Sequence, residues 1–94
     1  MEEILKKYND MFKKAVVVFG VKTQLVVVIE EMAELTKEIS KWFRGEDNRD
    51  RLLDEYVDVL VMLEQLKNIF QFTDEEIDKH LEYKLSRIQE RLNK

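Results

Sequence analysis

The chain contains no proline and only two glycines, Gly20 and Gly45, among its 94 residues. Because tight turns and many-stranded sheets rely on these residues, their scarcity favours long helices joined by short connections. Apolar residues recur at three- and four-residue spacing along most of the chain, which is the helical pattern. The sequence therefore predicts an all-α fold in which residues 1–94 form a single domain.

The periodicity predicts four helices. They are expected at about residues 2–19, 23–44, 47–70 and 73–92. Gly45 is placed to cap the second helix at its C-terminus, and Thr73 with Glu76 fits a capping box that opens the fourth. The fourth helix carries one apolar stripe, formed by Ile77, Leu81, Leu85, Ile88 and Leu92.

A β-hairpin is the alternative for one stretch. Val16–Phe19 and Leu25–Ile29 are β-branched runs on either side of Gly20. We favour helices, because the helical period continues through both runs and an isolated two-stranded hairpin is marginally stable. So short a chain cannot bury all these apolar helix faces by itself. The sequence thus predicts a helical bundle completed by homo-oligomerisation, most simply a homodimer, with a tetramer as the alternative.

Composition excludes several classes of protein. With 45% apolar and 38% charged residues, the chain is too apolar for disorder and too charged for a membrane span. Its net charge of −4 argues against a protein that holds nucleic acid by the phosphates. The absence of cysteine excludes disulfides and zinc-thiolate sites. The first residues lack the apolar core of a secretory signal, so the cytoplasm is the expected location.

Four acids on two expected helices point to metal chemistry. Glu31 and Glu34 are three residues apart on the second helix, as are Glu55 and Asp58 on the third. Residues at this spacing share a helix face, so the two pairs can form an oxygen-lined cage. Glu55 projects into the apolar arc of its helix, where an unpaired carboxylate carries a large desolvation cost. An all-oxygen ligand set predicts Mg²⁺, with Mn²⁺ as a substitute.

Two arrangements would account for some of these acids without a metal. Acids at such spacing occur on many solvated helix faces. Alternatively, Arg51 lies one turn before Glu55 and can neutralise it with an ion pair. That pair would explain Glu55 and leave Asp58 unexplained.

A basic stripe follows the fourth expected helix, directly beside its apolar stripe. Its members fall within about 60° of one another on the helical wheel: His80, Lys84, Arg87 and Arg91. By itself such a stripe can be an ordinary solvated flank. Beside a metal cage it is what a polyphosphate requires, because the cations neutralise phosphate oxygens that the metal does not contact.

The order of these residues resembles a known family. Glu-Glu-x-x-Glu (Glu30, Glu31, Glu34), a spacer of roughly twenty residues and Glu-x-x-Asp (Glu55, Asp58) is similar to the signature of the all-α nucleoside triphosphate pyrophosphohydrolases of the MazG-like superfamily. The match covers roughly residues 21–91. The resemblance implies hydrolysis of a nucleoside or deoxynucleoside triphosphate to the monophosphate and pyrophosphate, in house-cleaning or control of the nucleotide pool.

The resemblance also implies roles for individual residues. Glu31, Glu34, Glu55 and Asp58 stand where the family holds Mg²⁺. Arg51, Lys84 and Arg87 stand where such enzymes often carry phosphate-binding bases, and Arg91 continues the same stripe.

Two acids beside the cage, Glu30 and Glu38, are candidates to orient or deprotonate the attacking water. Trp42 lies on the same side of its helix as Glu31 and ~16 Å further along the axis, within reach of an extended nucleotide. Its indole is therefore a candidate to stack on the base. The alternative is that Trp42 closes the end of a helix interface together with Phe43.

Two other functions fit the same features. The chain also resembles phosphoribosyl-ATP pyrophosphohydrolase of histidine biosynthesis, which has a similar length and helix order. A non-catalytic helical oligomerisation module would use the acids and bases for ion pairs between helices. Mg²⁺ distinguishes the module from an enzyme, because it raises the melting temperature only of a protein that binds it.

Overall fold

A computed structural model describes all residues from 1 to 94, and the chain is helical with no strand. Its five helices are α1 (Glu2–Lys7), α2 (Asn9–Phe19), α3 (Val21–Phe43), α4 (Arg49–Phe70) and α5 (Asp74–Leu92). The all-α prediction is confirmed. The hairpin alternative is wrong, because Val16–Phe19 belongs to α2 and Leu25–Ile29 to α3.

The first expected helix is in fact two helices, because the backbone turns at Tyr8. Its φ of −102° and ψ of 13° lie outside the helical region. The Tyr8 N–H donates to the carbonyl of Leu5, three residues back, at 3.2 Å. No glycine or proline marks this break, so the apolar period runs through it and the sequence predicts one helix where there are two.

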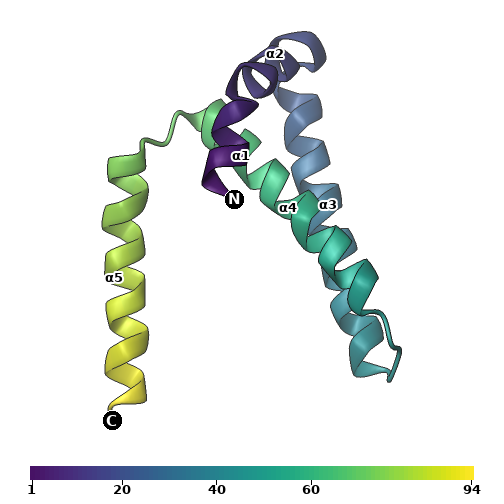
Figure 1. Ribbon diagram of the computed structural model, residues 1–94, viewed down its shortest axis with the longest axis vertical. Helices are drawn as coiled ribbons and strands as arrows, with labels where there is room; N and C mark the ends of the chain where they lie inside the picture. The colour runs from purple at the N-terminus through teal and green to yellow at the C-terminus, as the bar shows by residue number, and fades with distance from the viewer.

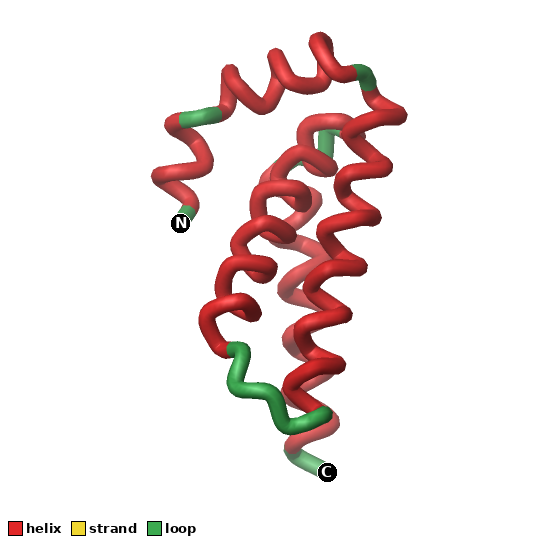
Figure 2. The backbone as a smooth tube through the Cα atoms, turned by 90° about the vertical axis from the view of Figure 1, so that its right-hand side faces the viewer, coloured by secondary structure: helices red, strands yellow, loops and turns green.

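Gly20 is the single residue between α2 and α3. Its φ of 86° is one that residues with a side chain rarely adopt. Because the turn is so short, α3 starts at Val21 rather than near Thr23. The sharp change of direction lays α2 across the end of the pair formed by α3 and α4 (Figures 1 and 2).

The helices α3 and α4 run antiparallel and form the main body of the molecule, which we call the α3–α4 pair (Figure 1). Gly45 follows the end of α3 with a φ of 90°, and its N–H donates to the Trp42 carbonyl at 2.9 Å, as expected of a capping glycine. None of the five helices combines the length and apolarity needed to cross a lipid bilayer.

The centre of the body is held by polar as well as apolar side chains. Phe12 and Val28 are the buried apolar residues. Gln65, only 1% exposed, donates through Nε2 to the Phe12 carbonyl and to Gln24 Oε1, both at 2.9 Å. One amide therefore connects α2, α3 and α4, which fixes α2 on the pair.

The last helix stands apart from the others. Thr73 and Glu76 form the predicted capping box at its start. The first turns of α5 line an open pocket with α1, through Ile77 and Leu5, and the rest of α5 extends away from the other helices (Figure 1). Every residue from 71 to 94 is exposed. The radius of gyration is 16.0 Å, against about 12 Å for a compact chain of this length. The expected number of helices, four, is corrected to five, and completion of the bundle by a second copy of the chain stays a prediction. A single chain packs α2, α3 and α4 together and leaves the apolar stripe of α5 uncovered.

Candidate metal centre

Three acids meet where α3 and α4 pack against each other. Glu31 comes from α3, and Glu55 and Asp58 come from α4. One carboxylate oxygen from each lies within 4.8 Å of the others. The three-residue spacing keeps Glu55 and Asp58 on one face, and antiparallel packing turns that face toward Glu31. We call these three residues the acid cluster.

Burial and mutual repulsion both act on the acid cluster. Desolvation raises the pKa of Glu31, and the negative charges of Asp58 and Glu34 raise it further. Desolvation likewise raises the pKa of Glu55, with added contributions from Asp58 and Glu31. The cluster without a cation therefore resists full ionisation, and a positive charge among the carboxylates would relieve the repulsion.

Glu34, the fourth expected ligand, lies at the edge of the cluster. Its side chain is exposed, one helical turn beyond Glu31. Desolvation and the charge of Asp58 contribute most to the raised pKa of both Glu31 and Glu55, and the charge of Glu34 also contributes. The structure thus brings three of the four expected ligands together and places the fourth beside them.

Glu55 has no cationic partner. Its Oε2 atom is buried and makes no hydrogen bond. Arg51, the residue expected to neutralise it in the alternative without a metal, instead contacts Glu38 through Nε at 3.1 Å and Glu46 through an Nη atom at 3.4 Å. The ion-pair explanation for Glu55 is therefore wrong in this structure.

The acid cluster fits a hard divalent cation. Its donors are carboxylate oxygens only, without the nitrogen or sulfur ligands that favour zinc. A buried carboxylate oxygen that lacks any partner is costly, and a cation would provide one. Magnesium accepts a few carboxylates and completes its octahedron with water or substrate oxygens. The residues present therefore suit Mg²⁺ or Mn²⁺.

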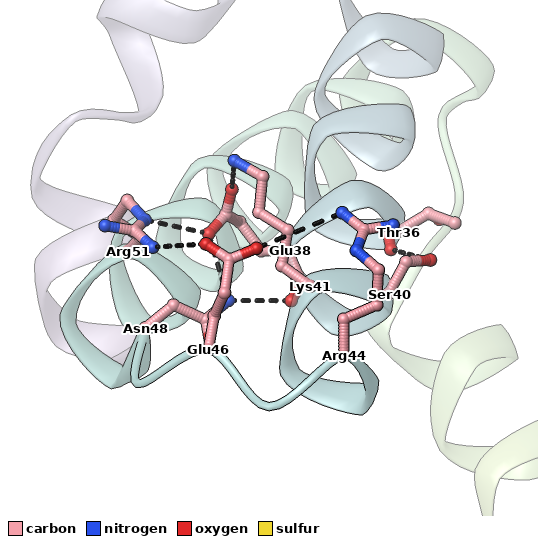
Figure 3. Close-up of polar contacts among 8 residues, drawn as sticks. All are labelled: Thr36, Glu38, Ser40, Lys41, Arg44, Glu46, Asn48 and Arg51. Atoms are coloured by element: carbon pink, nitrogen blue, oxygen red, sulfur yellow. Dashed lines mark hydrogen bonds and ion pairs between the residues drawn. The ribbon is translucent and has the colours of Figure 1, made fainter.

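Glu38 belongs to a polar network next to the acid cluster, near the connection between α3 and α4 (Figure 3), and it lines one pocket together with Arg51 and Glu55. Its buried carboxylate accepts hydrogen bonds from Lys41 Nζ at 3.0 Å, and from Asn48 Nδ2 and Arg51 Nε at 3.1 Å each. The bonds from Lys41, Asn48 and Arg51 lower the pKa of Glu38 to about 2. So weak a base has little tendency to take a proton from water near neutral pH. This geometry gives Glu38 a structural role, and its expected role at the attacking water stays a prediction.

Asn48 is a buried member of the Glu38 network that the sequence did not predict. It precedes α4, but its side chain makes no N-cap hydrogen bond there. Instead Nδ2 donates to both the backbone carbonyl of Glu38, at 2.8 Å, and the Glu38 carboxylate. Asn48 is 2% exposed, so it ties the end of α3 to the start of α4 inside the protein. Its place before a helix suggested an ordinary cap and gave no sign of this partner.

Two other expected site residues, Glu30 and Trp42, are exposed to solvent. Glu30 is exposed and adjoins the acid cluster in sequence, and its charge is the smallest contribution to the raised pKa of Glu31, after desolvation, Asp58 and Glu34. Trp42 is 58% exposed and packs edge-on against Phe43, with ring centroids 5.2 Å apart. Both arrangements leave the expected roles as predictions.

The structure does not bring the basic stripe to the acid cluster within one chain. His80, Lys84, Arg87 and Arg91 all lie on α5, which is exposed along its whole length. Arg87 instead packs over the Tyr83 ring, with its guanidinium carbon 5.8 Å from the ring centroid. Arg51, the other expected phosphate-binding base, is held by Glu38 and Glu46 (Figure 3).

Comparison of the chain with known protein families, with curated protein sequences and with solved structures found no match.

Proposed function

We propose that this protein is a Mg²⁺-dependent pyrophosphohydrolase that converts a nucleoside or deoxynucleoside triphosphate to the monophosphate and pyrophosphate. One observation carries the proposal: the buried, unpartnered Oε2 of Glu55 stands among carboxylates with no cation to neutralise it. The sequence pattern that resembles the MazG-like superfamily supports the same chemistry, because three of its spaced acids form the acid cluster.

The acid cluster would hold the cation, with Glu34 able to join from its edge. When bound, a divalent cation would offset the charge on the phosphate oxygens of the substrate. Glu30, which is exposed and adjoins Glu31 in sequence, would orient a water molecule and accept its proton. The water oxygen then bonds to the α-phosphorus, the bond from that phosphorus to the α–β bridging oxygen breaks, and pyrophosphate leaves.

Further parts of the proposal concern the substrate and the assembly. An exposed Trp42 leaves its ring free for a base to stack on. Lys84, Arg87 and Arg91 would bind the phosphates, and the chain would act as a homo-oligomer because so much apolar surface is exposed.

A non-catalytic oligomerisation module is the second candidate, favoured by the uncovered stripe of α5. Phosphoribosyl-ATP is the alternative substrate, on the strength of the second resemblance alone.

The experiment combines binding with product analysis. Purified protein is titrated with Mg²⁺ and Mn²⁺ by calorimetry, then incubated with each common NTP and dNTP and with phosphoribosyl-ATP. Saturable binding of the metal and release of pyrophosphate support the proposal. Asp50→Asn, an exposed acid in the first turn of α4, is the matched control for Glu55→Gln. Metal binding that is equally strong in Glu55→Gln would exclude the acid cluster as the site.

A further inference from the structure

The apolar stripe of α5 is built to be covered, but its own chain does not cover it. Leu81 is 51% exposed, Leu85 54% and Leu92 75%. A helix with one apolar face normally packs that face against another element. An exposed stripe of this length on a folded protein marks an interaction surface.

The junction between α4 and α5 holds α5 away from the rest of its chain. Gln71 ends α4 in the left-handed conformation, with a φ of 56°. Across the connection, Lys67 Nζ lies 2.6 Å from Asp74 Oδ1, and the rings of Phe70 and Phe72 stack at 5.9 Å. With the capping box at Thr73, these contacts fix the direction of α5. As a result, α5 extends away from the α3–α4 pair of its own chain.

The solvent-accessible surface area of the single chain is larger than that expected for a folded monomer of this size. The molecule exposes 8048 Å², roughly 2,300 Å² more than a folded monomer of its size is expected to expose. Obligate dimers bury about 2,000–5,000 Å² in total, which is about half of that per chain. The excess of one chain is thus of the size that an obligate dimer hides.

The α3–α4 pair presents an apolar face that could receive α5. On each helix, several exposed apolar residues form a stripe that is rotated by about 90–130° from the side that faces the other helix. Three further exposed apolar residues, Val26, Val57 and Val61, lie outside these stripes. Because the two helices run antiparallel, equal rotations bring both stripes to the same side of the pair. The face comprises Val21, Ile29, Met32, Ile39, Phe43, Leu53, Tyr56 and Leu63.

Charge favours the same pairing. Lys84 and Arg87 flank the apolar stripe of α5 on one side within about 60° of each other, whereas the α3–α4 pair carries the acid cluster. A helix packed on the pair lies about one helix diameter, roughly 10 Å, from the carboxylates between α3 and α4. Long basic side chains at the edge of that helix can cover the remaining distance.

We propose that two copies of the chain exchange α5, so that each α5 packs its apolar stripe on the α3–α4 pair of the other copy and supplies Lys84 and Arg87 to that copy's acid cluster. The exchange follows from the packing and the area. The use of the two cations at the acid cluster rests on the proposed function.

The exchange is tested first by crosslinking that is independent of any metal. Chains carrying the photoreactive residue p-benzoylphenylalanine in place of Leu85 are mixed with ¹⁵N-labelled wild-type chains, and crosslinked peptides are identified by mass spectrometry. We expect light α5 peptides joined to heavy α3 or α4 peptides. Products confined to one chain, or products that join α5 only to α5, would overturn the exchange.

Sedimentation of wild type and of two matched variants tests whether the α5 stripe holds the dimer together. Wild type is expected to be a dimer at micromolar concentration and Leu81→Glu a monomer with unchanged helical circular dichroism. Ser86→Glu, on the opposite side of α5, should remain dimeric. A wild-type monomer at that concentration contradicts the proposal.

The position of the cations is tested with Mn²⁺ as a paramagnetic probe. A ¹⁵N-labelled Glu55→Gln chain, whose own site is disabled, is mixed with unlabelled wild type. Broadening of the Lys84 and Arg87 amides by Mn²⁺ supports delivery of α5 to the partner's site. If those amides broaden only in labelled wild type alone, α5 serves its own chain and the proposal is wrong. If Mn²⁺ broadens nothing, the proposed function and the delivery of cations to a metal site both fail, and the crosslinks still decide the exchange.

Discussion

Arg51 donates through Nε to Glu38, 3.1 Å away, and this contact leaves Glu55 without a cationic partner one turn further along α4. The one base close in sequence to the acid cluster is thus committed to a different carboxylate. Glu38 is satisfied by three donors, whereas Glu55 faces two other acids. This division separates a structural network from a site that has a place for a cation.

The acid cluster should lose its metal when one acid is neutralised. Glu55→Gln and Asp58→Asn are expected to weaken Mg²⁺ binding by roughly 100-fold or more, since the loss of even an outer-shell partner costs about 10–100-fold. Without metal, the melting temperature of both variants should equal or exceed that of wild type, because repulsion within the cluster is relieved. Calorimetric titration and thermal melts in chelator measure the two effects. Wild-type affinity in both variants would refute the ligand assignment.

Without metal, the contribution of the acid cluster to the free energy of unfolding should fall as the pH rises. Since desolvation and neighbouring acids raise the pKa of Glu55 and Glu31 above 4.5, the folded state binds protons more tightly than the unfolded chain. The stability from this source is fully present below pH 4.5 and is lost as the pH rises through the raised pKa values. Urea unfolding of wild type and Glu55→Gln in chelator should show a gap in unfolding free energy that widens in this direction. Saturating Mg²⁺ should close the gap, and a gap that does not depend on pH would contradict the assignment.

The Glu38 network should respond to pH in the opposite direction. Bonds from Lys41, Asn48 and Arg51 lower the pKa of Glu38 to about 2 from 4.5, so their contribution is present above pH 4.5 and is lost as the pH falls toward 2. Asn48→Ala removes the Nδ2 donor from the buried Glu38 carboxylate and from the Glu38 carbonyl, and taking a partner from a buried charged acceptor costs about 1–3 kcal/mol. Urea unfolding of Asn48→Ala and wild type should show this loss of unfolding free energy, with Mg²⁺ affinity unchanged because the Asn48 side chain bonds to Glu38 and to none of the three acids of the cluster. A large loss of Mg²⁺ affinity in Asn48→Ala would instead show that the Glu38 network and the acid cluster are coupled.

Gln65 should control the attachment of α2. Gln65→Ala leaves the Phe12 carbonyl and Gln24 Oε1 without their shared donor, at a cost of about 1–3 kcal/mol. We expect faster amide exchange in α2 than in wild type, with the centre of α3 less affected. Gln89→Ala, an exposed glutamine on α5, is the control and should leave the exchange rates in α2 unchanged. Uniform acceleration throughout the chain would show that the amide stabilises the whole fold.

Lys84→Ala and Arg87→Ala should impair catalysis far more than folding. Exposed cations contribute about 0–1 kcal/mol to stability, whereas a cation at developing phosphate charge contributes several. We expect Lys84→Ala to lower kcat/KM by roughly ten- to a thousandfold, with Mg²⁺ affinity retained. Lys79→Ala, on another side of α5, is the control. Normal turnover in Lys84→Ala, or a loss that merely follows the unfolded fraction in thermal melts, would contradict phosphate binding.

The sequence by itself determined most of the helices and which acids share a helix face. The scarcity of turn residues and the three- and four-residue apolar period are local properties, so they predicted α3, α4 and α5 closely. The capping box at Thr73 was equally visible, because its partners are three residues apart. The same spacing placed Glu55 and Asp58 on one face, and the apolar arc around Glu55 showed that this face was turned inward.

Only the tertiary structure decided which groups meet across helices. A helical wheel gives the direction of a side chain but not its partner. It could not show that Arg51 of α4 donates to Glu38 of α3, or that Asn48 donates to the Glu38 carbonyl. The break at Tyr8 depends on backbone angles that no local residue signals. The direction of α5 likewise depends on the Lys67–Asp74 contact and the left-handed Gln71. The periodicity of α5 predicted a face that must be covered, and the fold left that face outside its own chain because the junction with α4 directs the helix away.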